Sequence, residues 1–185
     1  MALEDTLGQM KFTINIPLNQ PIENNPENTS DAHTEQIIAQ NTLNYLAGKL
    51  SGMGSYVKKI YNIRAVEAYR EAVGDMADLF ISLQVKVKPE ITSSIAMVRY
   101  FKEDTVDSIN LAEKIVHRLN KSEWFAKCGC IEEDPVVEIN EHTSSMILAI
   151  CIGNDLLCNY NLDEDRFIER LVEFILYSIT DNYDY

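Results

Sequence analysis

Four cysteines are the first residues whose side chains could take part in chemistry. Two of them, Cys128 and Cys130, flank a single glycine. Structural zinc sites usually space paired cysteines two to four residues apart, with ligands converging at about 2.0–2.3 Å. Redox-active pairs have two intervening residues, so a one-residue spacing matches neither pattern. We therefore expect ordinary reduced thiols near a strand. A zinc site completed by Cys151, Cys158 or a histidine is the alternative.

A second cluster combines carboxylates with an imidazole. Glu138, Glu141 and His142 are close in sequence and follow three acidic residues at 132–134. Such groups can bind a hard cation or transfer protons to and from a substrate. They lie in predicted strand ends and a turn, where charged side chains are normally solvated. We interpret them as surface residues, with metal binding or catalysis as the alternative.

Short motifs of the common enzyme families are missing from the sequence. It has no glycine-rich phosphate loop, no G-x-S-x-G nucleophile, no H-E-x-x-H pair and no paired C-x-x-C spacing. These absences favour a non-enzymatic protein without a cofactor. The rival interpretation is a small enzyme built on Glu138, Glu141 and His142, assisted by a divalent ion.

One aromatic pair could serve either the core or an interface. Trp124 and Phe125 directly follow a predicted helix, and Trp124 is the only tryptophan. Large aromatic side chains at a helix end usually bury against the core. When exposed, they are also the residue types that anchor protein interfaces. We favour the core and keep the interface as the alternative.

Charge is distributed unevenly along the chain, whose net charge is −13. Residues 1–48 hold six acids and one base, residues 49–127 ten acids and thirteen bases, and residues 128–185 thirteen acids and two bases. An acidic surface disfavours direct binding to nucleic-acid phosphates, whose affinity depends on Lys and Arg. A basic protein partner, or contact between oppositely charged surfaces of two copies, fits better. Acidity that serves solubility alone is the simpler alternative.

These observations favour a non-enzymatic, acidic interaction protein: an adaptor, a chaperone-like protein or an inhibitor. We expect it to form a homo-oligomer and to bind a basic partner through its C-terminal third. A structural subunit of a larger assembly is a further alternative. The candidate partner-binding residues are one aromatic pair and five acids: Trp124, Phe125, Asp163, Glu169, Glu173, Asp181 and Asp184.

Length and composition predict one domain over residues 1–185. No apolar run reaches the roughly 18 residues of a membrane span. The first residues carry acids where a secretory signal would carry bases. We therefore expect a cytoplasmic protein, or one in a host's cytoplasm. A polar stretch at 19–33 predicts a mobile loop.

Apolar periodicity predicts the elements that would position these groups. Residues 11–16 and 79–87 alternate as half-buried strands do. Spacings of three to five predict a helix over 34–50 and a second over 57–76, joined as an antiparallel hairpin.

Beyond residue 90, we expect one further strand, a helix, three short strands and a last helix, at 95–101, 105–119, 136–139, 146–152, 156–160 and from 163. Adjacent strands without intervening helices predict an α+β fold. The expected sheet is mostly antiparallel, with about five to six strands and four helices.

Overall fold

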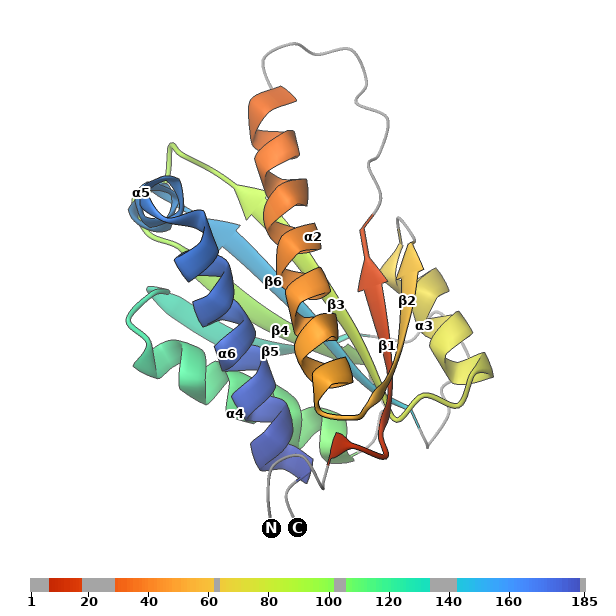
Figure 1. Ribbon diagram of the computed structural model, residues 1–185. Coiled ribbons are helices and arrows are strands. Elements are labelled where there is room, and N and C mark those ends of the chain that lie inside the picture. The colour runs from red at the N-terminus through yellow and green to blue at the C-terminus, as the bar shows by residue number, and fades with distance from the viewer. Residues whose placement is uncertain (1–6, 18–28, 62–63, 102–105, 134–142, 184–185) are drawn as a thin grey trace.

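The computed structural model describes residues 7–17, 29–61, 64–101, 106–133 and 143–183. Within these residues the chain forms a six-stranded sheet with the order β2-β1-β3-β6-β4-β5 (Figure 1). β2, β1, β3 and β6 are parallel to one another, whereas β4 is antiparallel to β6 and parallel to β5. The strands are β1 Lys11–Ile16, β2 Tyr56–Tyr61, β3 Leu79–Val87, β4 Ile95–Phe101, β5 Lys127–Glu133 and β6 Ser144–Ile152.

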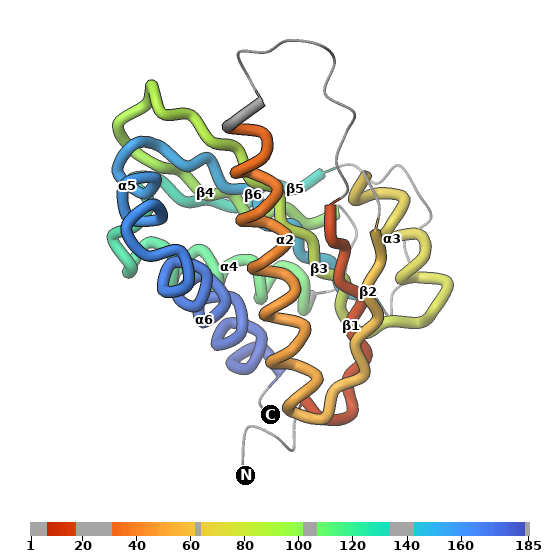
Figure 2. Tube along the Cα trace, turned by 45° about the horizontal axis from the view of Figure 1, so that its top comes forward, coloured from red at the N-terminus to blue at the C-terminus, as the bar shows by residue number. Residues whose placement is uncertain are grey.

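Helices cover the two faces of this sheet unequally. The described helices are α2 Thr29–Gly52, α3 Ala65–Gly74, α4 Val106–Lys121, α5 Asn154–Leu162 and α6 Glu164–Tyr183. α2, α4 and α6 pack on one face, and α3 lies on the other beside β1 and β3 (Figures 1 and 2). This gives a three-layer arrangement in which one outer layer consists of α3 alone.

The main core forms where strand and helix periodicities meet. Along β3, Leu79, Ile81 and Leu83 point to the face that carries α2 and α6, and each is at most 1% exposed. On α6, Leu171 and Ile175 lie four residues apart and complete the same core. Asp163 starts this helix, because its Oδ1 accepts a hydrogen bond from the Arg166 backbone N–H at 3.0 Å.

A second, smaller core lies beneath α3 on the opposite face. Its centre is Tyr69, whose ring contacts Phe80 of β3 at 5.6 Å and Phe101 of β4 at 4.7 Å between centroids. The Tyr69 hydroxyl donates a hydrogen bond to the Thr143 carbonyl oxygen at 3.0 Å. α3 therefore fixes three strands at once.

The expectation of a mostly antiparallel sheet with four helices is wrong, because the described sheet is mixed and mostly parallel, with five helices. Two misassigned segments explain the error. Residues 56–61 form a strand and not the start of the second helix, so no helical hairpin exists. Residues 154–162 form α5 and not a strand, since Leu156 and Tyr160 are buried at a helical spacing of four.

Other expectations fall outside the described residues, wholly or in part. The predicted strand at 136–139 lies outside them, and so does most of the polar stretch at 19–33. Residues 29–33 belong to α2. That the whole chain forms one domain stays a prediction.

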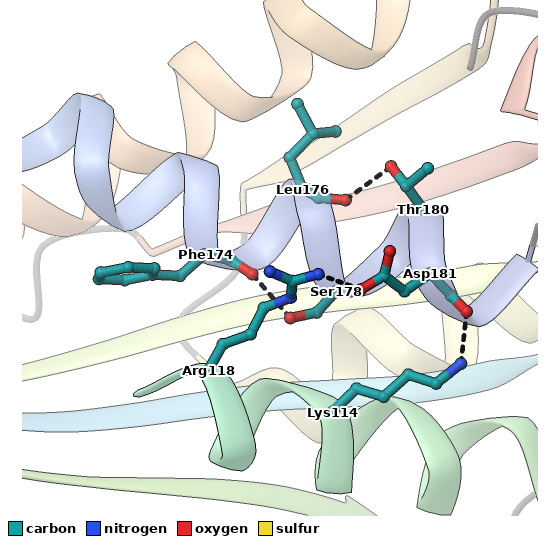
Figure 3. A network of polar contacts seen from close by, with 7 residues as sticks. All are labelled: Lys114, Arg118, Phe174, Leu176, Ser178, Thr180 and Asp181. Atoms are coloured by element: carbon teal, nitrogen blue, oxygen red, sulfur yellow. Dashed lines mark hydrogen bonds and ion pairs between the residues drawn. The ribbon is translucent and has the colours of Figure 1, made fainter. Parts of the chain in front are cut away.

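Charged side chains join α4 to α6 (Figure 3). Arg118 donates to the Asp181 carboxylate, and Lys114 donates to the Asp181 carbonyl oxygen. On α6, Ser178 and Thr180 donate to carbonyl oxygens four residues earlier, at 2.7 and 2.9 Å. Part of the basic middle of the sequence is thus neutralised by the acidic end of the same chain.

Replacing Asp181 with asparagine is expected to lower the free energy of unfolding by less than about 1 kcal/mol, because exposed ion pairs contribute little. Half of the Asp181 side chain is exposed. Urea unfolding measures the change, and Glu169→Gln on the same helix is the control. A loss above about 2 kcal/mol would mean that this contact is far more important than its exposure implies.

Candidate functional site

The sheet face that carries α3 is open beyond that helix. Side chains alternate along β3, so Gln84 points to this face, where it is exposed. Gln84 is paired with Ala149 of β6, and Ala149 is paired in turn with Met97 of β4. Ala149 and Met97 are both half-buried, so this part of the face carries a small side chain beside the exposed Gln84.

Polar side chains from β3, β4 and β5 meet on this open face. Arg99 Nη1 lies 2.7 Å from Glu133 Oε1, and Arg99 Nη2 donates to the Gln84 side-chain oxygen. Arg99 is 24% exposed and Glu133 32% exposed, so the ion pair is half-buried. Arg99 Nε is buried without an acceptor among the described residues, which leaves one guanidinium donor unused.

A buried pair extends this group along the same face. Asn15 Nδ2 of β1 donates to Ser82 Oγ of β3 at 3.3 Å, and both residues are 2% exposed. We call the five residues the polar cluster: Asn15, Ser82, Gln84, Arg99 and Glu133. The sequence signal for it was weak, because a polar residue every second position in a strand usually faces solvent.

Hydrogen bonds fix the carboxyl ends of the parallel strands, where ligands of open α/β sheets generally bind. Glu35 of α2 accepts a bond from the Val87 backbone N–H at 2.9 Å and pairs with Lys86 Nζ at 3.1 Å. Ser94 Oγ donates to Asp155 Oδ1 at 2.6 Å and accepts from the Gly153 N–H at 2.8 Å. These bonds hold the loops after β3 and β6 in place.

Close packing explains why position 153 is a glycine. A Cβ atom at this position would lie 2.8 Å from the Ile91 carbonyl oxygen and 3.0 Å from the Ser93 carbonyl carbon. Only glycine allows the segment before β4 to approach the end of β6 so closely. The carboxyl ends of β3 and β6 are therefore packed closely against the segment before β4, whereas Arg99 and Glu133 lie toward the amino ends of those strands.

Hydrogen bonding is the chemistry that the polar cluster offers. Its exposed and half-buried members are a guanidinium, one amide and one carboxylate, which recognise carboxylate, carbonyl and hydroxyl groups, while Asn15 and Ser82 are buried and bond to each other. Across the described part of the chain, no group of three His, Cys, Asp or Glu side chains is placed to hold a metal ion.

Cys128 and Cys130 both lie on β5, Cys128 half-buried and Cys130 exposed. Burial raises the pKa of both thiols, with the Glu113 carboxylate adding to the effect at Cys130. A raised pKa keeps the thiol protonated, which disfavours metal binding and nucleophilic attack. Glu138, Glu141 and His142 lie outside the described residues.

The described residues predicted to bind a partner have different structural roles, and their use by a partner stays a prediction. Trp124 stacks on Phe167 at 5.0 Å between centroids and contacts Phe174, while Phe125 is 5% exposed, so this pair packs into the core. The acids are used differently: Asp163 begins α6, Asp181 binds α4, Glu169 is exposed and Glu173 is half-buried. Asp184 lies outside the described residues.

No family model and no curated protein matches this sequence. Solved structures with the same arrangement exist. The N-acetylmuramyl-L-alanine amidase Ami1 from Mycobacterium smegmatis has a TM-score of 0.73 and 12% identity, over 97% of this chain and 99% of that chain. This chain has the same fold as that amidase.

Two further amidases support this statement. CwlD from Clostridioides difficile was solved in complex with the GerS lipoprotein. It has a TM-score of 0.67 and 15% identity, over 94% of this chain and 98% of that chain. AmiC2 of Nostoc punctiforme has a TM-score of 0.65 and 11% identity, over 96% of this chain and 99% of that chain.

This likeness overturns the main functional expectation. We expected a non-enzymatic adaptor, chaperone-like protein or inhibitor, but almost the whole chain has the fold of solved amidases. The same finding corrects the broader description drawn from the sequence, that of an acidic protein of unknown function that binds other proteins.

Other expectations stay predictions: the homo-oligomer, the basic partner and the cytoplasmic location. None of the described helices is long and apolar enough to cross a membrane.

Proposed function

We propose that this chain binds ligands of the N-acetylmuramoyl-L-alanine class at the polar cluster. The observation that carries the proposal is the Arg99 guanidinium, held between Gln84 and Glu133 on the open sheet face of an amidase fold. The solved structures with this fold are named for a reaction at the amide between N-acetylmuramic acid and L-alanine. That junction is rich in the groups that the cluster can bind.

The ligand and the cluster are chemically complementary. A muramoyl-alanine carries amide carbonyls, sugar hydroxyls and a carboxylate, which accept hydrogen bonds from guanidinium and amide N–H groups. Glu133 and the Gln84 carbonyl oxygen can accept bonds from hydroxyl and amide N–H groups in return. Exposed Ile95 and Ile131 and half-buried Met97 provide apolar surface on the same face for the alanine methyl group.

Amide hydrolysis is a second candidate function, favoured by the likeness of the whole fold to amidases. Hydrolysis needs an activated water molecule or an activated nucleophile. The described residues supply neither a metal-binding group nor a thiol with a lowered pKa. The catalytic groups of this second candidate would therefore include residues outside the described ranges.

Binding is tested by isothermal titration calorimetry with N-acetylmuramoyl-L-alanine, using N-acetylglucosamine as the ligand control. Gln84→Ala is expected to weaken binding about three- to tenfold through the loss of a hydrogen-bonding amide. Arg99→Lys removes the planar fork and is expected to weaken binding more. Lys88→Ala, an exposed change just after β3, should bind like the wild type. Absence of wild-type binding, or equal binding by all variants, would disprove the proposal.

Hydrolysis has a separate readout, which is the appearance of free L-alanine from the same compound. The reaction is followed with added Zn²⁺ and with a chelator. Release of alanine that Gln84→Ala reduces would support hydrolysis at this site. Binding without release under either condition would remove the second candidate and leave the first intact.

A further inference from the structure

β5 forms one end of the sheet, with β4 as its only strand neighbour among the described residues. An edge strand presents unpaired backbone groups that can bond to another strand. β5 is seven residues long, and Cys130 and Ile131 near its centre are both exposed, Ile131 by 41%. This edge therefore has both the backbone groups and the apolar surface for pairing.

The sequence of β5 is complementary to itself in the antiparallel direction. With Cys130 on a two-fold axis, Lys127 lies opposite Glu133 of a second copy. Opposite charges at paired positions stabilise antiparallel strands. The same register places Ile131 opposite Gly129, so the branched side chain meets the one residue without a side chain.

Geometry agrees with this register. Lys127, Gly129, Ile131 and Glu133 share the open face of the sheet, since side chains alternate along a strand. A two-fold axis perpendicular to the sheet keeps the faces of both copies on the same side, so each pair meets on one face. Both contacts occur twice in the symmetric pair.

The opposite edge of the sheet lacks this property. β2 carries Lys58 and Lys59 at its centre. Antiparallel pairing of β2 with its own copy brings lysines opposite each other in each central register, which is destabilising. Basic residues are a known protection of edge strands against pairing. Of the two edges, only β5 combines opposite charges at its ends with an apolar centre.

We propose that two copies of this chain associate through antiparallel pairing of β5 about Cys130, which joins the two sheets into one. The interface is isologous, with the same strand contributed by each copy. This inference is argued from the edge position and the sequence of β5, and it shares Ile131 and Glu133 with the ligand surface proposed above.

Sedimentation equilibrium over a wide concentration range is expected to show a monomer–dimer equilibrium. Ile131→Lys introduces two charges at the two-fold interface and should raise the dimer dissociation constant by about tenfold or more. Circular dichroism checks that the variant is folded. Lys127→Glu, which opposes acid to acid, is the second variant and should weaken the dimer in the same direction. A monomer at all concentrations, or a dimer unaffected by both changes, would overturn the inference.

Cross-linking tests the register itself. Two opposed Cys130 thiols can form one disulfide when diamide accepts the two protons and two electrons that are released. The covalent dimer is expected with the wild type and with Cys158→Ser, whose thiol is exposed on α5, but not with Cys130→Ser. A covalent dimer that survives Cys130→Ser and is lost in Cys158→Ser would contradict pairing through β5.

Discussion

Truncation of Tyr69 to alanine is expected to lower the free energy of unfolding by about 3–5 kcal/mol, the usual range for removing a buried aromatic side chain. Tyr69 is fully buried and its ring contacts Phe80 and Phe101. The small core under α3 is formed by few residues, so neighbouring side chains have little means to refill the cavity. Urea or thermal unfolding measures the loss.

Two matched variants separate the causes of this effect. Tyr69→Phe keeps the ring and removes only the hydroxyl that bonds to the Thr143 carbonyl oxygen, so it should cost about 1 kcal/mol. Tyr56→Ala removes a tyrosine that is 66% exposed and should change stability little. A loss below about 1 kcal/mol for Tyr69→Ala would mean that α3 contributes little to the fold.

Alkaline pH is expected to destabilise the protein through Tyr183. Burial raises the pKa of this phenol from 10.0 to about 12. A raised pKa means that the folded state retains the proton while the unfolded state releases it. The stabilising contribution is therefore complete below about pH 10 and is lost between about pH 10 and pH 12, a change of about 2–3 kcal/mol.

The measurement is the urea midpoint as a function of pH for the wild type and for Tyr183→Phe. Phenylalanine has no proton to lose, so the variant should lose less stability across this range. Tyr160, whose pKa burial also raises to about 12, is present in both proteins and contributes to the remaining dependence. Parallel curves for the two proteins would contradict the assignment to Tyr183.

Periodicity predicted the elements whose pattern is strong. The strands at 79–87 and 95–101 and the last helix occupy the expected residues because each has one clearly apolar face. Periodicity failed at 56–61, where Val57 and Ile60 fit a helical spacing as well as a strand. It also failed at 127–133, where β5 has few buried side chains and no alternation to detect. Strand direction could not be predicted, since it depends on partners far away in sequence.

Little of the candidate site could be predicted from sequence. Gln84 and Arg99 are separate polar residues in two strands, and only the pairing of both strands with β6 brings them together. The cysteines and carboxylates attracted attention because their side chains are reactive in isolation. Burial raises the pKa of the Cys128 and Cys130 thiols, which lowers the fraction of reactive thiolate at neutral pH.

The position of β6 in the sheet has a consequence for how the chain matures during synthesis. β6 lies between β3 and β4 but is the last strand to be made, and Leu79 pairs with Ser144 only after the intervening residues have been added. Translation at about 5–20 residues per second delays that pairing by roughly 3–13 seconds. During this interval the apolar strands β3 and β4 lack their common neighbour. The nascent chain is therefore expected to depend on chaperones, or on slow release from the ribosome, until β6 has been made.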